Sequence, residues 1–160
     1  MNHKRIIIVG RGASGKDHMR KLLERKGYSY AKSYTTRPPR PDEANGRDYK
    51  FITEDKAQTM ISTGLFYEWV RFNEWIYGTT VEQIQGEDLF IMTPRGLSQL
   101  KPDDRSDSLV IFLDIPEAVR RQRMLDREMP GDSVERRLSA DYADFFKFTD
   151  YDIRITNSDF

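Results

Sequence analysis

The hydrophobic pattern of the chain begins with a short β-branched run that gives way to helical spacing after a glycine-rich turn. The run at residues 5–9, RIIIV, is typical of a buried parallel strand. Met19, Leu22 and Leu23 then recur on one helical face, and Gly27 marks a stop. The pattern predicts a strand, a glycine loop and a helix as the first unit.

The second half of the chain repeats this alternation of strands and helices. Apolar runs predict strands at residues 89–92, 109–113 and 153–155, and Pro116 precedes a helix that continues to Arg127. The segment from Asp132 to Glu135 fits a capping box. The helix after it is predicted to bury one face, made of Val134, Leu138, Tyr142 and Phe145. Alternating strands and helices indicate an open α/β sheet.

A different pattern separates these two parts. Residues 33–85 are rich in Pro, Gly, Tyr and Trp and contain the strand-like pieces YKFI, FYEWVRF and IYGTT. One helix is predicted near residues 54–63, and Trp69, Phe72 and Trp75 are expected in a small core. We interpret the segment as an insertion with its own mixed sheet. The prediction is a single domain, 1–160, with its core at 1–32 and 86–160.

Composition narrows the class of function. Charged residues make up 32% of the chain but cancel to a net charge of zero, which disfavours a nucleic-acid or membrane-surface binder. The chain has no cysteine, and its apolar runs are too short for a membrane span or a signal peptide. We therefore expect a cytoplasmic protein with no nucleic-acid or membrane partner, and a monomer and a homodimer both stay open.

The glycine loop GRGASGKD approaches the phosphate-loop pattern G-x-x-x-x-G-K-[ST]. Its amides would form an anion nest at a helix N-terminus, and Lys16 would reach the outer phosphates of ATP. An ordinary glycine turn is the alternative, but the strand before the loop and the helix after it favour phosphate binding. The residues predicted to bind the nucleotide are Gly10, Arg11, Gly12, Ala13, Ser14, Gly15, Lys16, Asp17 and His18.

Asp17 departs from this pattern because it stands where a hydroxyl residue is usual. A carboxylate is a hard, charged oxygen donor and a better Mg²⁺ ligand than a hydroxyl. It would repel the phosphates unless a metal lay between them. Asp17 is therefore predicted to be a metal ligand.

A second set of candidate residues lies in the insertion. Arg37 and Arg40 flank the rigid pair Pro38-Pro39, and two guanidinium groups can grip one phosphate. Tyr49 adds a hydroxyl donor, and Glu68 stands in an apolar strand context. The alternatives are a surface loop for the arginines and a solvated strand residue for Glu68.

Three segments of the insertion, SYTTRPPRPDEANGRDYKF, FYEWVRF and IYGTT, resemble the GMP site of guanylate kinases. The resemblance covers nearly the whole chain. It implies a P-loop kinase fold, a three-layer α/β/α parallel sheet with an inserted mixed α+β GMP-binding subdomain and a helical lid at 123–137. It implies phosphorylation of GMP or dGMP by ATP with Mg²⁺. By resemblance, the acceptor phosphate would be held by Arg37, Arg40, Tyr49 and Tyr77, and the base by Ser33, Glu68 and Thr79.

The chemistry of guanine agrees with that assignment. Guanine presents two adjacent donors, N1–H and the N2 amine, and one carboxylate at Glu68 can accept both. Hydroxyl groups at Ser33 and Thr79 can donate to the O6 atom. Adenine would leave the carboxylate unpaired, and a site of this kind discriminates by roughly four orders of magnitude.

The segment RQRMLDREMPGDSVERRLSADYADF resembles the lid of the family. Arg123, Arg127 and Arg137 fall on its arginine positions, where they would neutralise charge on the transferred group. Asn157 matches the position that contacts the adenine of ATP.

Two features depart from the family pattern. In LFIMTPRG, the positions of two acids are held by Ile91 and Thr93, and Thr93 remains a predicted substrate contact. Our hypothesis is that the metal-directed carboxylate has moved to Asp17. The family's C-terminal helix also has no counterpart in this sequence, so one sheet face is expected to be less covered.

Two alternatives stay open. Ribose 1,5-bisphosphate kinases are similar to guanylate kinases, also carry GKD and lack the strand-three acids, but they need no base reader such as Glu68. Non-catalytic guanylate-kinase-like domains would bind phosphorylated partners through Arg37 and Arg40. These domains generally lose the phosphate loop, whereas Lys16 and three lid arginines are present here.

Overall fold

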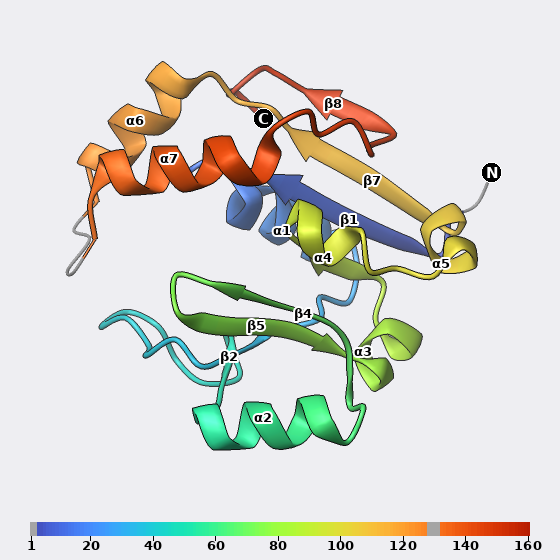
Figure 1. The fold of residues 1–160 in the computed structure, drawn as a ribbon. Coiled ribbons are helices and arrows are strands. Elements are labelled where there is room, and N and C mark those ends of the chain that lie inside the picture. The colour runs from blue at the N-terminus through green and yellow to red at the C-terminus, as the bar shows by residue number, and fades with distance from the viewer. Residues whose placement is uncertain (1–2, 128–131) are drawn as a thin grey trace.

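Four parallel strands form the central sheet of the protein (Figure 1). The structure, a computed structural model, describes residues 3–127 and 132–160. The strand order is β6-β1-β7-β8, with bounds β1 (Arg5–Gly10), β6 (Leu89–Ile91), β7 (Ser108–Leu113) and β8 (Ile153–Ile155). The predicted open α/β sheet is confirmed.

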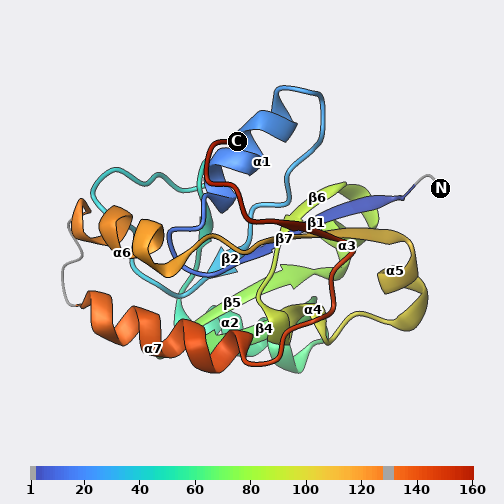
Figure 2. The same cartoon turned by 90° about the horizontal axis from the view of Figure 1, so that it is seen from above.

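Alternating side chains of the central strands build two hydrophobic layers. Ile7 and Val9 face one layer with Phe145, whereas Ile8 faces the other with Met19 and Val119. Figure 2 shows α1 and α7 on opposite sides of the sheet. The helices of this part are α1 (Lys16–Glu24), α4 (Pro94–Leu97), α5 (Pro102–Ser106), α6 (Glu117–Leu125) and α7 (Val134–Phe145). The central sheet is therefore the middle of three layers.

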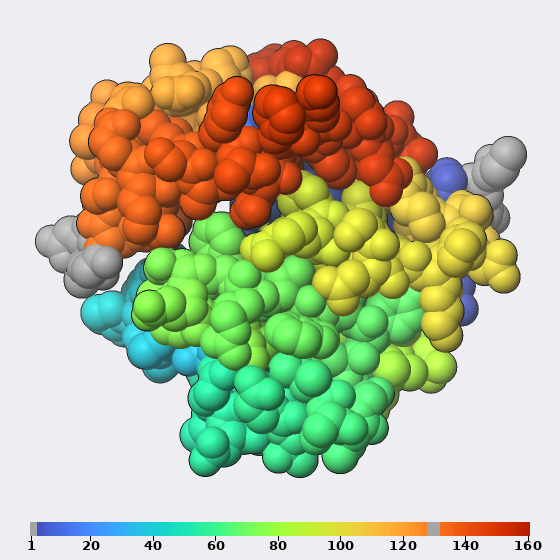
Figure 3. All heavy atoms as spheres, in the orientation of Figure 1, coloured from blue at the N-terminus to red at the C-terminus, as the bar shows by residue number. Residues whose placement is uncertain are grey.

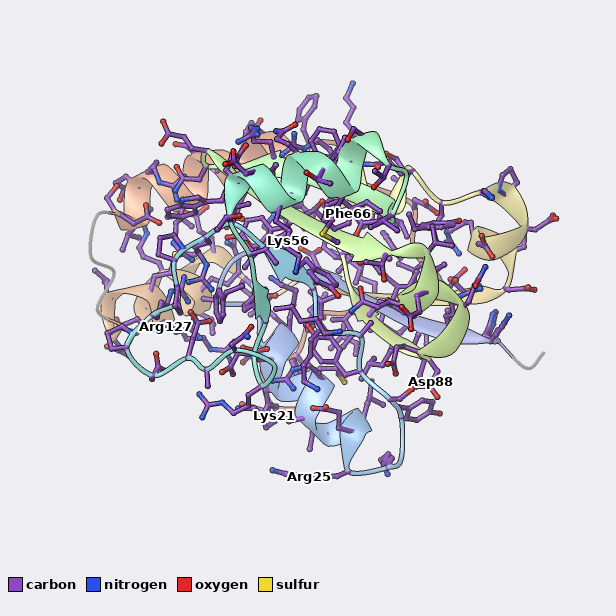
Figure 4. The ribbon with its side chains drawn as sticks, turned by 90° about the horizontal axis from the view of Figure 1, so that it is seen from below. Lys21, Arg25, Lys56, Phe66, Asp88 and Arg127 are labelled. Carbon is purple, nitrogen blue, oxygen red and sulfur yellow. The ribbon has the colours of Figure 1, made fainter. Side chains whose placement is uncertain are left out.

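The insertion forms a second, mixed sheet of order β3-β2-β5-β4. Phe66 lies between α2 and the β4–β5 pair (Figure 4), in a core with Ala57, Met60 and Ile76. Trp69 is at the surface, 36% exposed, so the prediction that it lies in this core is wrong. The elements are β2 (Tyr34–Thr35), β3 (Lys50–Phe51), α2 (Glu54–Ser62), β4 (Phe66–Phe72), β5 (Trp75–Thr80) and α3 (Val81–Gly86).

The start of α7 differs from the predicted capping box. Ser133 is the N-cap and accepts a hydrogen bond from the Arg136 amide at 3.1 Å, whereas Asp132 pairs with Arg136 and Arg137. Tyr142 is 71% exposed, so the predicted buried face is wrong at that position. Residues 128–131 of the predicted lid lie outside the described residues, as do residues 1–2 of the predicted core.

Within residues 3–127 and 132–160, every helix is too short or too polar to cross a membrane.

Candidate active site

A cavity of about 360 Å³ lies where the central sheet, the insertion and α7 meet. Its opening is visible in Figure 3 as a hollow between α7 and the β4–β5 hairpin. The volume suits a small-molecule site. The structure brings most of the predicted residues together in its wall: Gly10, Gly12, Ala13, Ser14, Gly15, Lys16, Asp17, His18, Ser33, Arg37, Arg40, Tyr49, Glu68, Tyr77, Thr93, Arg127 and Arg137.

The glycine loop joins the carboxyl end of β1 to the N-terminus of α1. Gly15 is the N-cap of α1, has a φ of 94° and makes no side-chain cap, so the first amides of the helix stay available to an anion. Gly10 leaves room for the Ser14 hydroxyl, which a Cβ at residue 10 would overlap. This buried hydroxyl has no hydrogen-bond partner among the described residues. The loop therefore fits a phosphate.

The Lys16 side chain folds back onto the loop that precedes it. Its Nζ donates to the carbonyl oxygens of Gly10 at 2.7 Å and Arg11 at 3.0 Å. Burial lowers the pKa of Lys16 to about 8, partly offset by the negative charges of Asp141 and Asp17. A bound triphosphate would add negative charge and raise this pKa again. Lys16 is thus placed to exchange carbonyl partners for phosphate oxygens.

Arg37 makes a two-pronged ion pair that sequence reasoning missed. Its two terminal nitrogens donate to the Glu43 oxygens at 2.8 and 2.9 Å, and its guanidinium lies over the Tyr49 ring at 5.2 Å. Burial would raise the pKa of Glu43, but hydrogen bonds from Arg37 and the Arg40 amide outweigh it and hold the pKa low. Glu43 therefore fixes the orientation of Arg37. The only sequence signal is an acid three residues after Arg40.

Two tyrosines stand beside this arginine. The rings of Tyr49 and Tyr77 meet edge to face, with their centroids 6.2 Å apart. Burial, and then the neighbouring Tyr77, raise the pKa of Tyr49 to about 12. The Tyr49 hydroxyl therefore stays protonated at neutral pH and can donate to a phosphate.

Glu68 is a buried carboxylate without a cation. It lies on β4, opposite Thr79, just after a β-bulge, and is 5% exposed. Burial raises its pKa to about 7, although hydrogen bonds from Thr79 act in the other direction. Gly96 makes room for it, because a Cβ there would stand 2.6 Å from Oε2. Among the described residues no Lys, Arg or His forms a salt bridge with Glu68.

The lid arginines occupy two places. Arg127 and Arg137 line the main cavity, and Arg137 donates to Asp132 at 2.8 Å. Arg123 donates to the Ala13 carbonyl at 3.0 Å and lines a neighbouring cavity of about 210 Å³. Arg127 lies at the end of α6 (Figure 4). The three arginines therefore approach the phosphate loop from α6 and α7.

Three predicted residues line neither of the two cavities. The Arg11 side chain points away, pairing with Asp114 at 2.6 Å and lying over the Phe145 ring. Thr79 is buried behind Glu68. Asn157 accepts a hydrogen bond from the Asp159 amide at 2.9 Å and lines neither cavity. Two roles stay predictions: binding of the nucleotide by the Arg11 backbone, and contact of Asn157 with the adenine of ATP.

The comparisons with known proteins agree on one protein family. The guanylate kinase family model matches residues 2–160. A guanylate kinase from a Nostoc species is 34% identical, and the match covers 100% of this chain and 85% of the relative. A guanylate kinase from Onion yellows phytoplasma is 35% identical over 73% of this chain and 60% of the relative. The match therefore spans less than two thirds of the length of that relative.

The fold has a counterpart among solved structures. The crystal structure of guanylate kinase from Anaplasma phagocytophilum matches with a TM-score of 0.75 and 21% identity. The match covers 99% of this chain and 79% of the other. At this identity the likeness concerns the fold alone.

Proposed function

Because this chain belongs to the guanylate kinase family, we propose that it transfers the γ-phosphoryl group of ATP to the phosphate of GMP or dGMP. The observation that carries the proposal is Glu68, a buried carboxylate in the cavity wall with no cation partner among the described residues. Thr79 donates to this carboxylate, but a buried charge without a cation is costly unless further donors reach it. The paired N1–H and N2 donors of guanine supply them.

The acceptor end of the cavity supplies cations and hydroxyl donors. Arg37, aligned by Glu43, and Arg40 would hold the GMP phosphate, and Tyr49 and Tyr77 would donate to its oxygens. An oxygen of that phosphate attacks the γ-phosphorus of ATP, the bond to the bridging oxygen breaks, and ADP leaves. The protein's task is to keep these atoms in line.

The donor end supplies positive charge where the negative charge of the phosphates gathers. Lys16 would donate to the β- and γ-phosphates, with Arg127 and Arg137 on the opposite side of the transferred group. Arg123 bonds the loop carbonyl of Ala13 and would hold the loop from behind. Closure of the two helices over the cavity would also exclude water.

The donor set fits a Mg²⁺ ion held mainly by substrate. Within the described residues no three His, Cys, Asp or Glu side chains cluster, so a complete protein cage for a metal is not formed there. Among the carboxylates that line the cavity, Asp17 is the one that directly follows Lys16 of the phosphate loop; its side chain is 80% exposed and lies 3.3 Å from Arg20 Nε. One carboxylate plus phosphates and water is the usual way of binding Mg²⁺. When bound, the ion would neutralise charge on the phosphates.

We expect replacement of Asp17 by Ala to raise the half-saturating Mg²⁺ concentration for turnover by roughly tenfold, because the carboxylate proposed to bind the ion is lost. Asp17→Ser should restore part of the affinity. Glu24→Ala is the matched control, since Glu24 binds the same Arg20 at 2.6 Å outside the cavity. Full turnover of Asp17→Ala at an unchanged Mg²⁺ requirement would refute the assignment.

A parallel ADP-release assay tests the function. We expect turnover with GMP or dGMP, and rates at least roughly a thousandfold lower with AMP, UMP and dTMP. Preference for ribose 1,5-bisphosphate would replace the proposal with the sugar-phosphate kinase. No turnover with any acceptor, together with binding of phosphorylated peptides, would favour the non-catalytic domain.

The balanced charge of the chain supports small nucleotides, rather than nucleic acid or membrane, as its partners. A cytoplasmic location and a monomeric or homodimeric state stay predictions.

A further inference from the structure

The carboxylate of Asp141, a residue late in the chain, contacts the phosphate loop near the N-terminus. Both of its oxygens accept hydrogen bonds from the Gly12 amide, at 3.2 and 3.1 Å, although the two residues are 129 positions apart. It lies on α7 and lines the cavity, yet its side chain is only 11% exposed. The sequence pattern did not identify Asp141 as a candidate site residue.

The carboxylate also binds α6. Arg120 approaches it at 3.3 Å, and the Arg120 Nε donates to the Ile115 carbonyl at 3.0 Å. Both charged side chains are buried. If either one moved away, the other would remain as an unpaired buried charge, which is energetically costly. Asp141 is therefore anchored, unlike an anion that merely fills an empty phosphate site.

The packing at Gly12 is tight against side chains of α6 and α7. A Cβ at residue 12 would stand 3.0 Å from Met124 Cε and 3.3 Å from an Asp141 oxygen. The backbone of the loop thus lies directly against α6 and α7. The contact is close enough to transmit a shift of either helix to the loop.

The three elements that meet at Asp141 carry the proposed catalytic cations. The loop leads to Lys16, α6 carries Arg123 and leads to Arg127, and α7 carries Arg137. Arg137 and Asp141 are four residues apart, so they project from the same face of α7. The position of Asp141 on the loop therefore determines where Arg137 stands relative to Lys16.

We propose that Asp141 is a positioning residue for phosphoryl transfer, which ties Gly12 of the phosphate loop to α6 and α7 and so sets the spacing between Lys16 and the lid arginines. The inference rests on the proposed function. The opposite role, a stand-in anion that ATP must displace, predicts tighter ATP binding when Asp141 is removed.

Two double variants isolate the bond to Gly12. Arg120→Met with Asp141→Asn removes both buried charges but keeps an acceptor for the Gly12 amide. Arg120→Met with Asp141→Leu removes the same charges and the acceptor. We expect the first to keep kcat within about fivefold of the wild type. The second should lose roughly 100-fold in kcat with KM for ATP changed less than about threefold, because misplacement costs the transition state most.

The matched control uses the surface contact between the same helices. Arg121 on α6 pairs with Glu135 on α7 at the exposed side, so Arg121→Met with Glu135→Gln loosens the helices without touching Gly12. Its kcat should stay within about twofold of the wild type. A comparable loss in this control, equal kcat in the two Asp141 double variants, or a lower KM for ATP in the Leu variant would overturn the proposal.

A loop variant keeps the proposal testable if the double variants fail to fold. Gly12→Ala adds a methyl group against Asp141 and Met124, and we expect it to lower kcat about tenfold with KM for ATP nearly unchanged. Wild-type kcat in Gly12→Ala would overturn the proposal. All measurements use whichever acceptor the wild-type protein phosphorylates. If that acceptor is not GMP or dGMP, the proposed function is refuted, but the role of Asp141 can still be tested.

Discussion

Replacing Lys16 with Met is expected to lower kcat for phosphoryl transfer by roughly three orders of magnitude. The ammonium group lies on the loop itself, where Nζ donates to two carbonyl oxygens that a phosphate can replace. Negative charge builds up on the transferred phosphoryl group in the transition state. No other residue of the loop is placed to neutralise it. Met keeps the apolar stem of the side chain and removes only the charge.

The control is Lys21→Met on the same helix. Lys21 is exposed on α1 (Figure 4) and lies outside both cavities, so kcat should stay within about twofold of the wild type. Steady-state kinetics with ATP varied at saturating acceptor give the measurement, and thermal unfolding checks that both variants fold. A folded Lys16→Met protein within tenfold of the wild-type kcat would contradict phosphate binding by this loop.

Hydrophobic patterning predicted the centre of the parallel sheet well because β1 and β7 are almost entirely buried. The short, β-branched apolar runs at residues 5–9 and 109–113 have the length and composition of buried parallel strands rather than helices. The short helices α3, α4 and α5 were not predicted, since four to six residues are too few to show a helical period. The first turns of α3 and α4 are fixed by the side-chain caps Thr80 and Thr93.

The error on α7 has a specific cause. Leu138, Asp141 and Phe145 form its buried stripe, whereas Tyr142 is on the exposed flank. A hydrophobic pattern assigns the polar residue of such a stripe to the surface. Asp141 is buried because Gly12 and Arg120 satisfy its carboxylate, and both partners are far away along the chain. Only the folded structure brings them together.

The candidate site, like the fold, could be predicted from the sequence only in part. Residues in the cavity wall were identified by resemblance, but the groups that orient them, such as Glu43, were not. The resemblance names a carboxylate at Glu68 without showing that it is buried and lacks a cation. Burial and missing partners are properties of packing, so they appear only when α4, β4 and β5 are placed around it.

Replacing Glu68 with Gln is expected to lower kcat/KM for GMP by roughly three to four orders of magnitude. The amide would offer one acceptor and one donor, so one of guanine's two donors would face another donor. The residue has nearly the same shape, and the loss therefore reports the charge. Glu54→Gln is the control, because Glu54 is an exposed carboxylate of the same subdomain that pairs with Arg71. Its kcat/KM should stay within about twofold of the wild type.

The pKa of Glu68 makes this prediction dependent on pH. With a pKa near 7 in the free protein, kcat/KM for GMP should rise with pH through 7 as the carboxylate ionises. Stability should change in the opposite direction. The folded protein holds this proton above the usual pKa of 4.5, so the free energy of unfolding contributed by Glu68 falls as pH rises from about 4.5 to beyond 7. Glu68→Gln should therefore unfold at a higher temperature than the wild type at pH 8 and lose that advantage near pH 4.5. A wild-type profile flat across pH 6–8, with no gain in stability for the variant at pH 8, would show that the carboxylate is solvated and does not bind the base.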